Sequence, residues 1–128
     1  MKSLTAVVAL ATAITAGGMA GPRAPRATIA SDSDPVIVDI DRIAFQTDTV
    51  RVAVGQTIRW VNREGVPHTV VSGTVTQSRR STTVRPDGLF ESEFLTKDDV
   101  FEFTPTEPGT IPYYCSLHPF MTAVIVVE

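Results

Sequence analysis

The chain has 128 residues, which is enough for one folded domain. Its formal net charge is −3, without a basic tail or an acidic run, so the charge pattern indicates no nucleic-acid partner. Hydrophobic residues make up 43% of the chain, as in globular proteins that bury a core. Val, Thr and Ile are frequent and long helical patterns are absent, so we expect β structure.

The first twenty residues have the pattern of an export signal. Lys2 supplies a positive charge, residues 4–16 are mostly apolar, and a short run of small residues suited to cleavage follows. The apolar run is too short to span a membrane comfortably. We therefore expect residues 1–20 to be a signal peptide, and the mature protein to be periplasmic or otherwise extracytoplasmic. An uncleaved signal, which would anchor the protein to a membrane, is the alternative.

Proline and small polar residues dominate residues 21–34, which we interpret as a flexible linker. The folded domain is expected to cover residues 35–128. It begins with residues 36–40, where apolar side chains alternate as in a strand with one buried face. Further strands are expected at residues 49–54, 57–62, 69–73, 100–104, 110–114 and 122–127.

This series of segments predicts an all-β protein. Residues 74–88 are polar and rich in Ser, Thr and Arg, and are interpreted as a mobile loop. The last run, residues 122–127, is largely apolar and is expected to be buried on both faces. About seven to eight short strands with frequent turns predict a two-sheet Greek-key β-sandwich.

The residues with metal-binding chemistry lie mainly in one stretch near the C-terminus. Cys115, His118 and Met121 follow one another at intervals of three, and Cys115 is the only cysteine. The second of the two histidines, His68, lies upstream in a Pro-His-Thr-Val context. Two imidazoles, a thiolate and a thioether are the donors of blue-copper electron-transfer sites. We therefore expect these four residues to bind one copper ion.

Export makes the single cysteine informative. In an oxidising compartment Cys115 has no intramolecular partner and is open to oxidation or cross-linking. Metal ligation would keep its sulfur as a protected thiolate. The alternative is a buried, inert thiol.

These segments resemble the small type 1 copper proteins of the cupredoxin superfamily, in particular the amicyanin, plastocyanin and halocyanin group. The resemblance rests on the runs 67–70, 109–115 and 116–121, and it covers roughly residues 35–128. The short Cys-x-x-His-x-x-Met loop is similar to that of amicyanin, because plastocyanin has a longer gap between histidine and methionine.

The resemblance implies a role for each donor. His68, Cys115 and His118 would form a trigonal plane around copper, with Met121 as a weak axial ligand. Backbone N–H groups near the cysteine sulfur would tune the reduction potential. Family members commonly have asparagine after the first histidine, whereas this chain has Thr69, whose hydroxyl can also bond across the loop.

The resemblance also implies a surface for redox partners. The His118 ring would reach the surface inside an apolar patch formed near Pro67, Leu117, Pro119 and Phe120, and small patches of this kind suit transient docking. Core packing is the alternative for Leu117 and Phe120. The protein is expected to be a monomer.

Three arginines in the polar segment are a second candidate for partner recognition. Arg79, Arg80 and Arg85 could steer an acidic partner, although a solvated loop is the favoured interpretation.

The function predicted from these observations is exported one-electron transfer through a mononuclear copper site. An enzyme is disfavoured, because no third residue or Gly-rich segment supports a Cys/His nucleophile. Multicopper oxidase or nitrite reductase chemistry would need further histidines. A copper chaperone, which favours an open and exchangeable site, and a domain with a degenerate site are the remaining alternatives.

Overall fold

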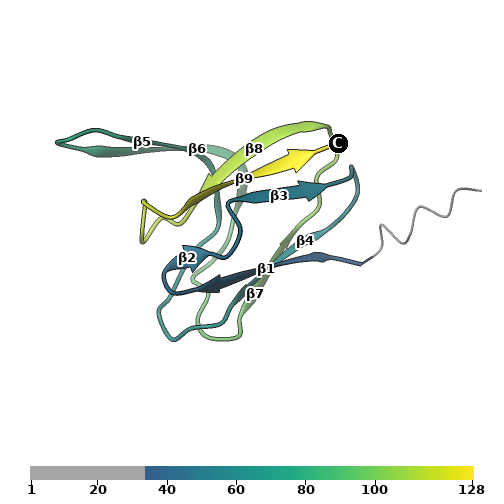
Figure 1. Cartoon of the computed structure of the whole chain (residues 1–128), viewed down its shortest axis with the longest axis horizontal. Coiled ribbons are helices and arrows are strands. Elements are labelled where there is room, and N and C mark those ends of the chain that lie inside the picture. The colour runs from purple at the N-terminus through teal and green to yellow at the C-terminus, as the bar shows by residue number, and fades with distance from the viewer. Residues whose placement is uncertain (1–33) are drawn as a thin grey trace, which may run out of the picture.

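The computed structural model describes residues 34–128. These residues form nine strands in two facing sheets, shown in Figure 1. The strands are β1 (Val36–Asp41), β2 (Ala44–Phe45), β3 (Thr49–Val52), β4 (Ile58–Asn62), β5 (Val71–Gln77), β6 (Thr82–Glu91), β7 (Val100–Phe103), β8 (Gly109–Tyr114) and β9 (Thr122–Val127). The predicted all-β sandwich is confirmed, with nine strands instead of seven to eight.

Two predictions fall on the N-terminal part of the chain, which the structure does not describe. The signal peptide at residues 1–20, and the linker at residues 21–34 except for its last residue, lie outside the described residues. Among residues 34–128, no helix has the length and apolar character needed to cross a membrane.

Both sheets mix parallel and antiparallel pairs. One sheet has the order β2-β1-β4-β7, and the other has the order β3-β9-β8-β5-β6. The parallel pairs are β1 with β4 and β3 with β9, which join segments distant in the sequence. These pairings bring the first and last parts of the described chain into the same two-layered core (Figure 1).

The core follows from the alternation of apolar side chains along the strands. In β4, Ile58 and Trp60 are fully buried as predicted, whereas Arg59 between them is only half-buried. Trp60 lies against an aromatic cluster, with its ring 5.4 Å from Tyr113 and 5.7 Å from Phe101 between centroids. These contacts join the two sheets, because Trp60 and Tyr113 come from opposite layers.

The last strand differs from its prediction. β9 lies inside the five-stranded sheet, yet only one of its faces is buried. Ala123, Ile125 and Val127 point into the core, whereas Val124 and Val126 are half-exposed. The expectation of a doubly buried strand was wrong because no third layer of described residues covers the outer face of this sheet.

The expectation of a mobile loop over residues 74–88 was also wrong. β5 and β6 pair in antiparallel register from Gln77 with Thr82 back to Gly73 with Pro86. Thr and Val recur along both strands, and β-branched residues favour extended backbone. The polar composition, which suggested a loop, reflects a ribbon whose side chains are mostly solvent-exposed.

Gly73 marks the point where this ribbon leaves the sheet. β5 pairs with β8 at Val71 and Ser72 only, and a register irregularity follows. Gly73 has a φ of +143°, and a Cβ added there would lie 2.2 Å from the carbonyl oxygen of Arg85. We call residues 73–86 the β5–β6 arm. In Figure 1 it projects beyond the sandwich, on the side where the β8–β9 loop lies.

The buried Tyr113 makes stability depend on pH in the alkaline range. Burial raises the pKa of Tyr113 to about 12 from its ordinary value of 10. Because folding favours the neutral phenol, this contribution is complete below pH 10 and is lost as the pH rises towards 12. We expect Tyr113→Phe to abolish a loss of about 2–3 kcal/mol over this range.

Urea unfolding of the metal-free protein at a series of pH values between 9 and 12 measures this effect. Equal alkaline losses in the wild type and in Tyr113→Phe would show that Tyr113 does not control it.

Candidate metal centre

Three chain segments meet at one end of the sandwich. His68 lies just before β5, and its backbone forms a bridge with Leu95, with N···O distances of 3.0 and 2.8 Å. Cys115 follows the last residue of β8, and His118 lies in the loop that leads to β9. Strand pairing between Val71 and Tyr114 therefore sets His68 and Cys115 side by side.

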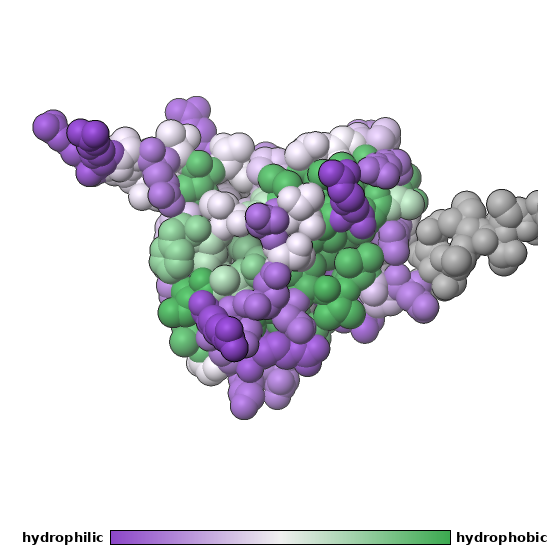
Figure 2. Space-filling model, in the orientation of Figure 1, coloured by the Kyte–Doolittle hydropathy of each residue, from purple (hydrophilic) through white to green (hydrophobic). Residues whose placement is uncertain are grey.

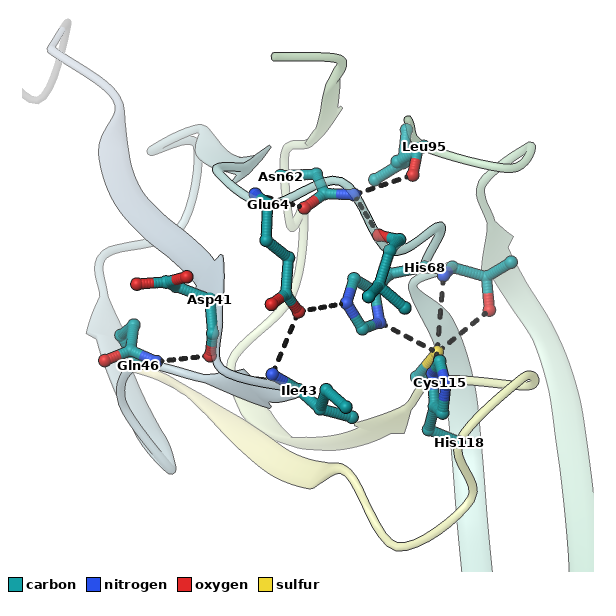
Figure 3. Close-up of polar contacts among 11 residues, drawn as sticks. Asp41, Ile43, Gln46, Asn62, Glu64, His68, Leu95, Cys115 and His118 are labelled. Carbon is teal, nitrogen blue, oxygen red and sulfur yellow. Dashed lines mark hydrogen bonds and ion pairs between the residues drawn. The ribbon is translucent and has the colours of Figure 1, made fainter. Parts of the chain in front are cut away.

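The side chains of these three residues converge. The Cys115 Sγ atom lies 3.8 Å from His68 Nδ1 and 3.7 Å from His118 Nδ1. The three potential ligand atoms all lie within 4.8 Å of one another. Cys115 and His68 are fully buried, whereas His118 is only partly buried. Figure 3 shows the His68 ring directed at the sulfur, with His118 next to Cys115.

Met121, the fourth predicted residue, closes the loop. Its side chain is buried, and its backbone N–H donates to the His118 carbonyl at 2.8 Å. The Cys115 N–H in turn donates to the Met121 carbonyl at 3.1 Å. These bonds hold residues 115–121 in a tight turn, so the structure brings all four predicted residues into one place.

Thr69 joins the two segments that carry the donors. Its backbone N–H donates to the Cys115 sulfur at 3.4 Å, and its hydroxyl accepts a hydrogen bond from the Ser116 N–H at 2.8 Å. The Thr69 and Ser116 hydroxyls also lie 2.7 Å apart. The threonine hydroxyl thus makes the cross-loop contact that the sequence suggested.

Glu64 is a residue of the site that the sequence reasoning missed. Its Oε1 atom lies 2.6 Å from His68 Nε2 and also accepts the Ile43 N–H at 2.9 Å. Figure 3 shows the His68 ring between Glu64 and Cys115. A proton on Nε2, donated to this carboxylate, leaves Nδ1 free to face the sulfur. The position of Glu64, four residues before the histidine, was the only signal in the sequence.

The environment of Glu64 favours its charged form. Burial raises the pKa of Glu64, but the hydrogen bonds from His68 and from the Ile43 amide outweigh it and lower the pKa overall. A carboxylate held in this state can orient the imidazole through a charge-assisted hydrogen bond.

Asn62 organises the turn that presents His68. The buried Asn62 amide donates to the carbonyls of Val66 and Leu95, both at 2.8 Å. Its side-chain oxygen accepts the Glu64 N–H at 3.0 Å. The turn predicted here from Asn, Arg, Glu and Gly is therefore pinned by its first residue.

The exposed surface around His118 is apolar, as predicted. Leu117 is 42% and Phe120 is 61% exposed, which rules out core packing for both. The Phe120 ring lies edge-on to the His118 ring at 5.9 Å. Pro67 is exposed and Pro119 is half-buried. The exposed Phe94, which the sequence analysis did not assign to a surface, lines a hollow next to Thr69 and Ser116.

The donor chemistry fits a soft or borderline metal ion. The cluster offers one buried thiol and two imidazole nitrogens, and it contains no carboxylate ligand. Such donors suit copper or zinc and disfavour magnesium and calcium.

Comparison with known proteins decides between these possibilities. The sequence profile of the copper binding proteins of the plastocyanin/azurin family matches residues 34–128. The chain belongs to this family. Its copper cofactor and its role as an electron carrier rather than an enzyme, both predicted from the sequence, are thereby confirmed.

Individual relatives agree with this assignment. Amicyanin of Paracoccus denitrificans is 33% identical over 126 residues, which cover 90% of this chain and 88% of that protein. The Cu(I) structure of an amicyanin methionine-to-alanine mutant matches with a TM-score of 0.57 at 32% identity, and covers 77% of this chain and 88% of its own. A purple cupredoxin from Nitrosopumilus maritimus matches with a TM-score of 0.59 at 27% identity, over 73% and 99% of the two chains.

Removal of the Glu64 carboxylate tests its role in this cupredoxin. Glu64→Ala leaves His68 Nε2 and the Ile43 N–H without their acceptor, so we expect a loss of about 1–3 kcal/mol in the unfolding free energy of the metal-free protein. Copper affinity should fall roughly 10- to 100-fold. Glu64→Gln keeps an acceptor oxygen and should retain most of both properties.

Urea unfolding and competitive copper titration supply the two readouts. Glu107→Ala, at an exposed turn position, is the control and should change neither. Equal defects in Glu64→Gln and Glu64→Ala would contradict a role for the hydrogen bond.

Proposed function

We propose that this cupredoxin is an exported one-electron carrier whose single copper ion is held by His68, Cys115, His118 and Met121. The observation that carries the proposal is the convergence of two Nδ1 atoms on one buried sulfur, at 3.8 and 3.7 Å. A buried thiol beside two imidazoles that are both directed at it is a donor set, whereas an inert core cysteine would be surrounded by apolar groups.

Copper bound here would supply a single electron by cycling between Cu(I) and Cu(II). The chain's own contribution is to keep the donors in place during this change. Cys115 is tied to Met121 and to Thr69 through its backbone and its sulfur, and His68 is held by Glu64. Donors that cannot move far lower the cost of reorganisation at each electron transfer.

Electrons would enter and leave at the His118 edge. Its partial exposure, next to the exposed side chains of Leu117 and Phe120, supports docking of redox partners at the patch around Pro67, Leu117, Pro119 and Phe120. A small apolar contact of this kind allows fast release. We also propose that the carrier works as a monomer, outside the cytoplasm, after removal of residues 1–20.

The closed site argues against a copper chaperone. His68 and Cys115 are completely buried, and three hydrogen bonds from backbone N–H groups, one of them to the sulfur itself, close the loop. A protein that hands over its metal needs ligands that a partner can reach.

A visible spectrum of the copper(II)-loaded protein tests the ligand assignment. We expect an intense thiolate-to-copper band that disappears in Cys115→Ala, because the band needs a sulfur–copper bond. Ser78→Ala, at the tip of the arm, should keep the band. A band that survives in Cys115→Ala, or a protein that takes up zinc but forms no such band with copper, would overturn the proposal.

The docking surface can be tested with a second copy of the protein as the partner. We expect Phe120→Lys to slow electron self-exchange roughly tenfold or more. When two copies meet through this patch, two positively charged lysines would repel each other in place of two apolar rings that can pack together. NMR line broadening in mixtures of reduced and oxidised protein measures this rate. Ile37→Lys, at another exposed apolar position on β1, is the control. Equal slowing in both variants would exclude this patch.

A further inference from the structure

The β5–β6 arm carries a charge opposite to that of the rest of the domain. Residues 73–86 include Arg79, Arg80 and Arg85 and contain no acidic side chain. The remaining described residues are acid-rich. They contain five lysine and arginine side chains and all of the described Asp and Glu side chains; the five are Arg42, Arg51, Arg59, Arg63 and Lys97. The arm is thus a positive projection on a negative body.

The arm's arginines are also free of the ion pairs that neutralise arginines elsewhere. Three body arginines each bind a carboxylate at 2.5–3.0 Å, and the pairs are Arg51 with Glu128, Arg59 with Glu102 and Arg63 with Asp39. Among the described residues, none of the three arm arginines forms such a pair, and all three are exposed. Their guanidinium groups can therefore bind carboxylates of another molecule.

The arm displays these charges from an ordered hairpin. At its tip the Ser78 N–H donates to the Ser81 carbonyl at 2.8 Å, and the Ser81 N–H donates to the Ser78 hydroxyl at 3.1 Å. Arg79 and Arg80 occupy the two central turn positions. A two-stranded ribbon alone is marginally stable in water, so its anchorage decides whether it persists.

That anchorage is a buried serine at the base of the arm. The Ser72 hydroxyl accepts the Phe90 N–H at 2.8 Å and lies 2.5 Å from Asp87 Oδ1. Ser72 is fully buried and pairs with Tyr113 of β8. Arg79 and Arg80 lie in the turn at the tip, whereas Arg85 pairs with Thr74 near the base, two residues before Asp87.

The base of the arm adjoins the metal centre. Val71 pairs with Tyr114, the residue before Cys115, and the Val70 N–H donates to the Ser92 hydroxyl at 2.8 Å. Figure 1 shows the arm projecting on the side of the molecule that holds the β8–β9 loop. In Figure 2 the arm is hydrophilic, and apolar surface lies below it on the same side. A molecule that contacts the His118 patch would thus meet the arm as well.

We infer that the β5–β6 arm steers an acidic redox partner onto the copper face. This inference rests on the proposed function, because the reduced copper centre must give one electron to the oxidised partner, or the reverse. The acidic body repels a negatively charged partner from most directions, whereas the three unpaired arginines attract such a partner to the side of the arm. Steering of this kind weakens as salt shortens the screening distance to about 10 Å at 0.1 M.

Two small oxidants of opposite charge test the inference on the copper-loaded protein. Hexacyanoferrate(III) is anionic, and tris(1,10-phenanthroline)cobalt(III) is cationic. Each takes one electron from Cu(I). We expect the triple variant Arg79→Gln, Arg80→Gln, Arg85→Gln to react with hexacyanoferrate(III) roughly tenfold more slowly at low ionic strength. The difference should fade at high salt, and the cationic oxidant should react at least as fast as with the wild type.

A second triple variant controls for net charge. Arg51→Gln, Arg59→Gln, Lys97→Gln removes the same charge from the body and should slow hexacyanoferrate(III) much less. Poly-L-glutamate should compete with hexacyanoferrate(III) in the wild type but not in the arm variant. An unchanged visible band in every variant shows that the copper site is intact.

The outcomes separate the possible explanations. Equal slowing in the two triple variants would mean that net charge acts and the arm does not. Arm-dependent binding to phosphatidylglycerol vesicles, with unchanged oxidation rates, would assign the arm to a membrane surface and overturn the inference. Failure of the wild type to react with either oxidant would instead overturn the proposed function.

Discussion

The structure depends on a buried sulfur that two distant segments must approach together. Cys115 directly follows β8, and His68 lies before β5, 47 residues earlier. The two residues lie close together because Val71 and Ser72 of β5 pair with Tyr114 and Tyr113 of β8. This pairing is only two residues long, yet it sets the distance between an imidazole and the thiol. A change in register by one residue would turn His68 away from the sulfur.

Polar contacts around this pair then restrict its geometry. Thr69 donates to the sulfur and binds Ser116. Glu64 holds the far side of the His68 ring, and Asn62 holds the turn that leads to His68. Each of these groups is buried or nearly so, and each satisfies a partner that would otherwise be left unpaired. The residues proposed to bind copper are therefore held by the protein itself, which suits a site that must change oxidation state without rearranging.

The same short pairing also separates two surfaces with different chemistry. Beyond Ser72 the chain leaves the sheet at Gly73 and builds the basic arm, whereas the loop after Cys115 exposes Leu117 and Phe120. An apolar contact favours brief association of any shape-complementary partner, and charge selects which partner arrives. The arm and the β8–β9 loop lie on the same side of the molecule, so one approach can use both surfaces (Figure 1).

The sequence by itself determined the copper chemistry and most of the strands, and it predicted a donor set, because residue type and local periodicity carry that information. Cys115, His118 and Met121 are close along the chain, and the burial of Ile58 and Trp60 follows from simple alternation. Only the tertiary structure decided what depends on pairing between distant segments. The Glu64 contact with His68, the one-sided burial of β9 and the hairpin in place of a loop at residues 74–88 are of this kind. A polar ribbon exposed on both faces has the composition of a loop, and its hydrogen bonds to a neighbouring strand leave no periodic mark in the sequence.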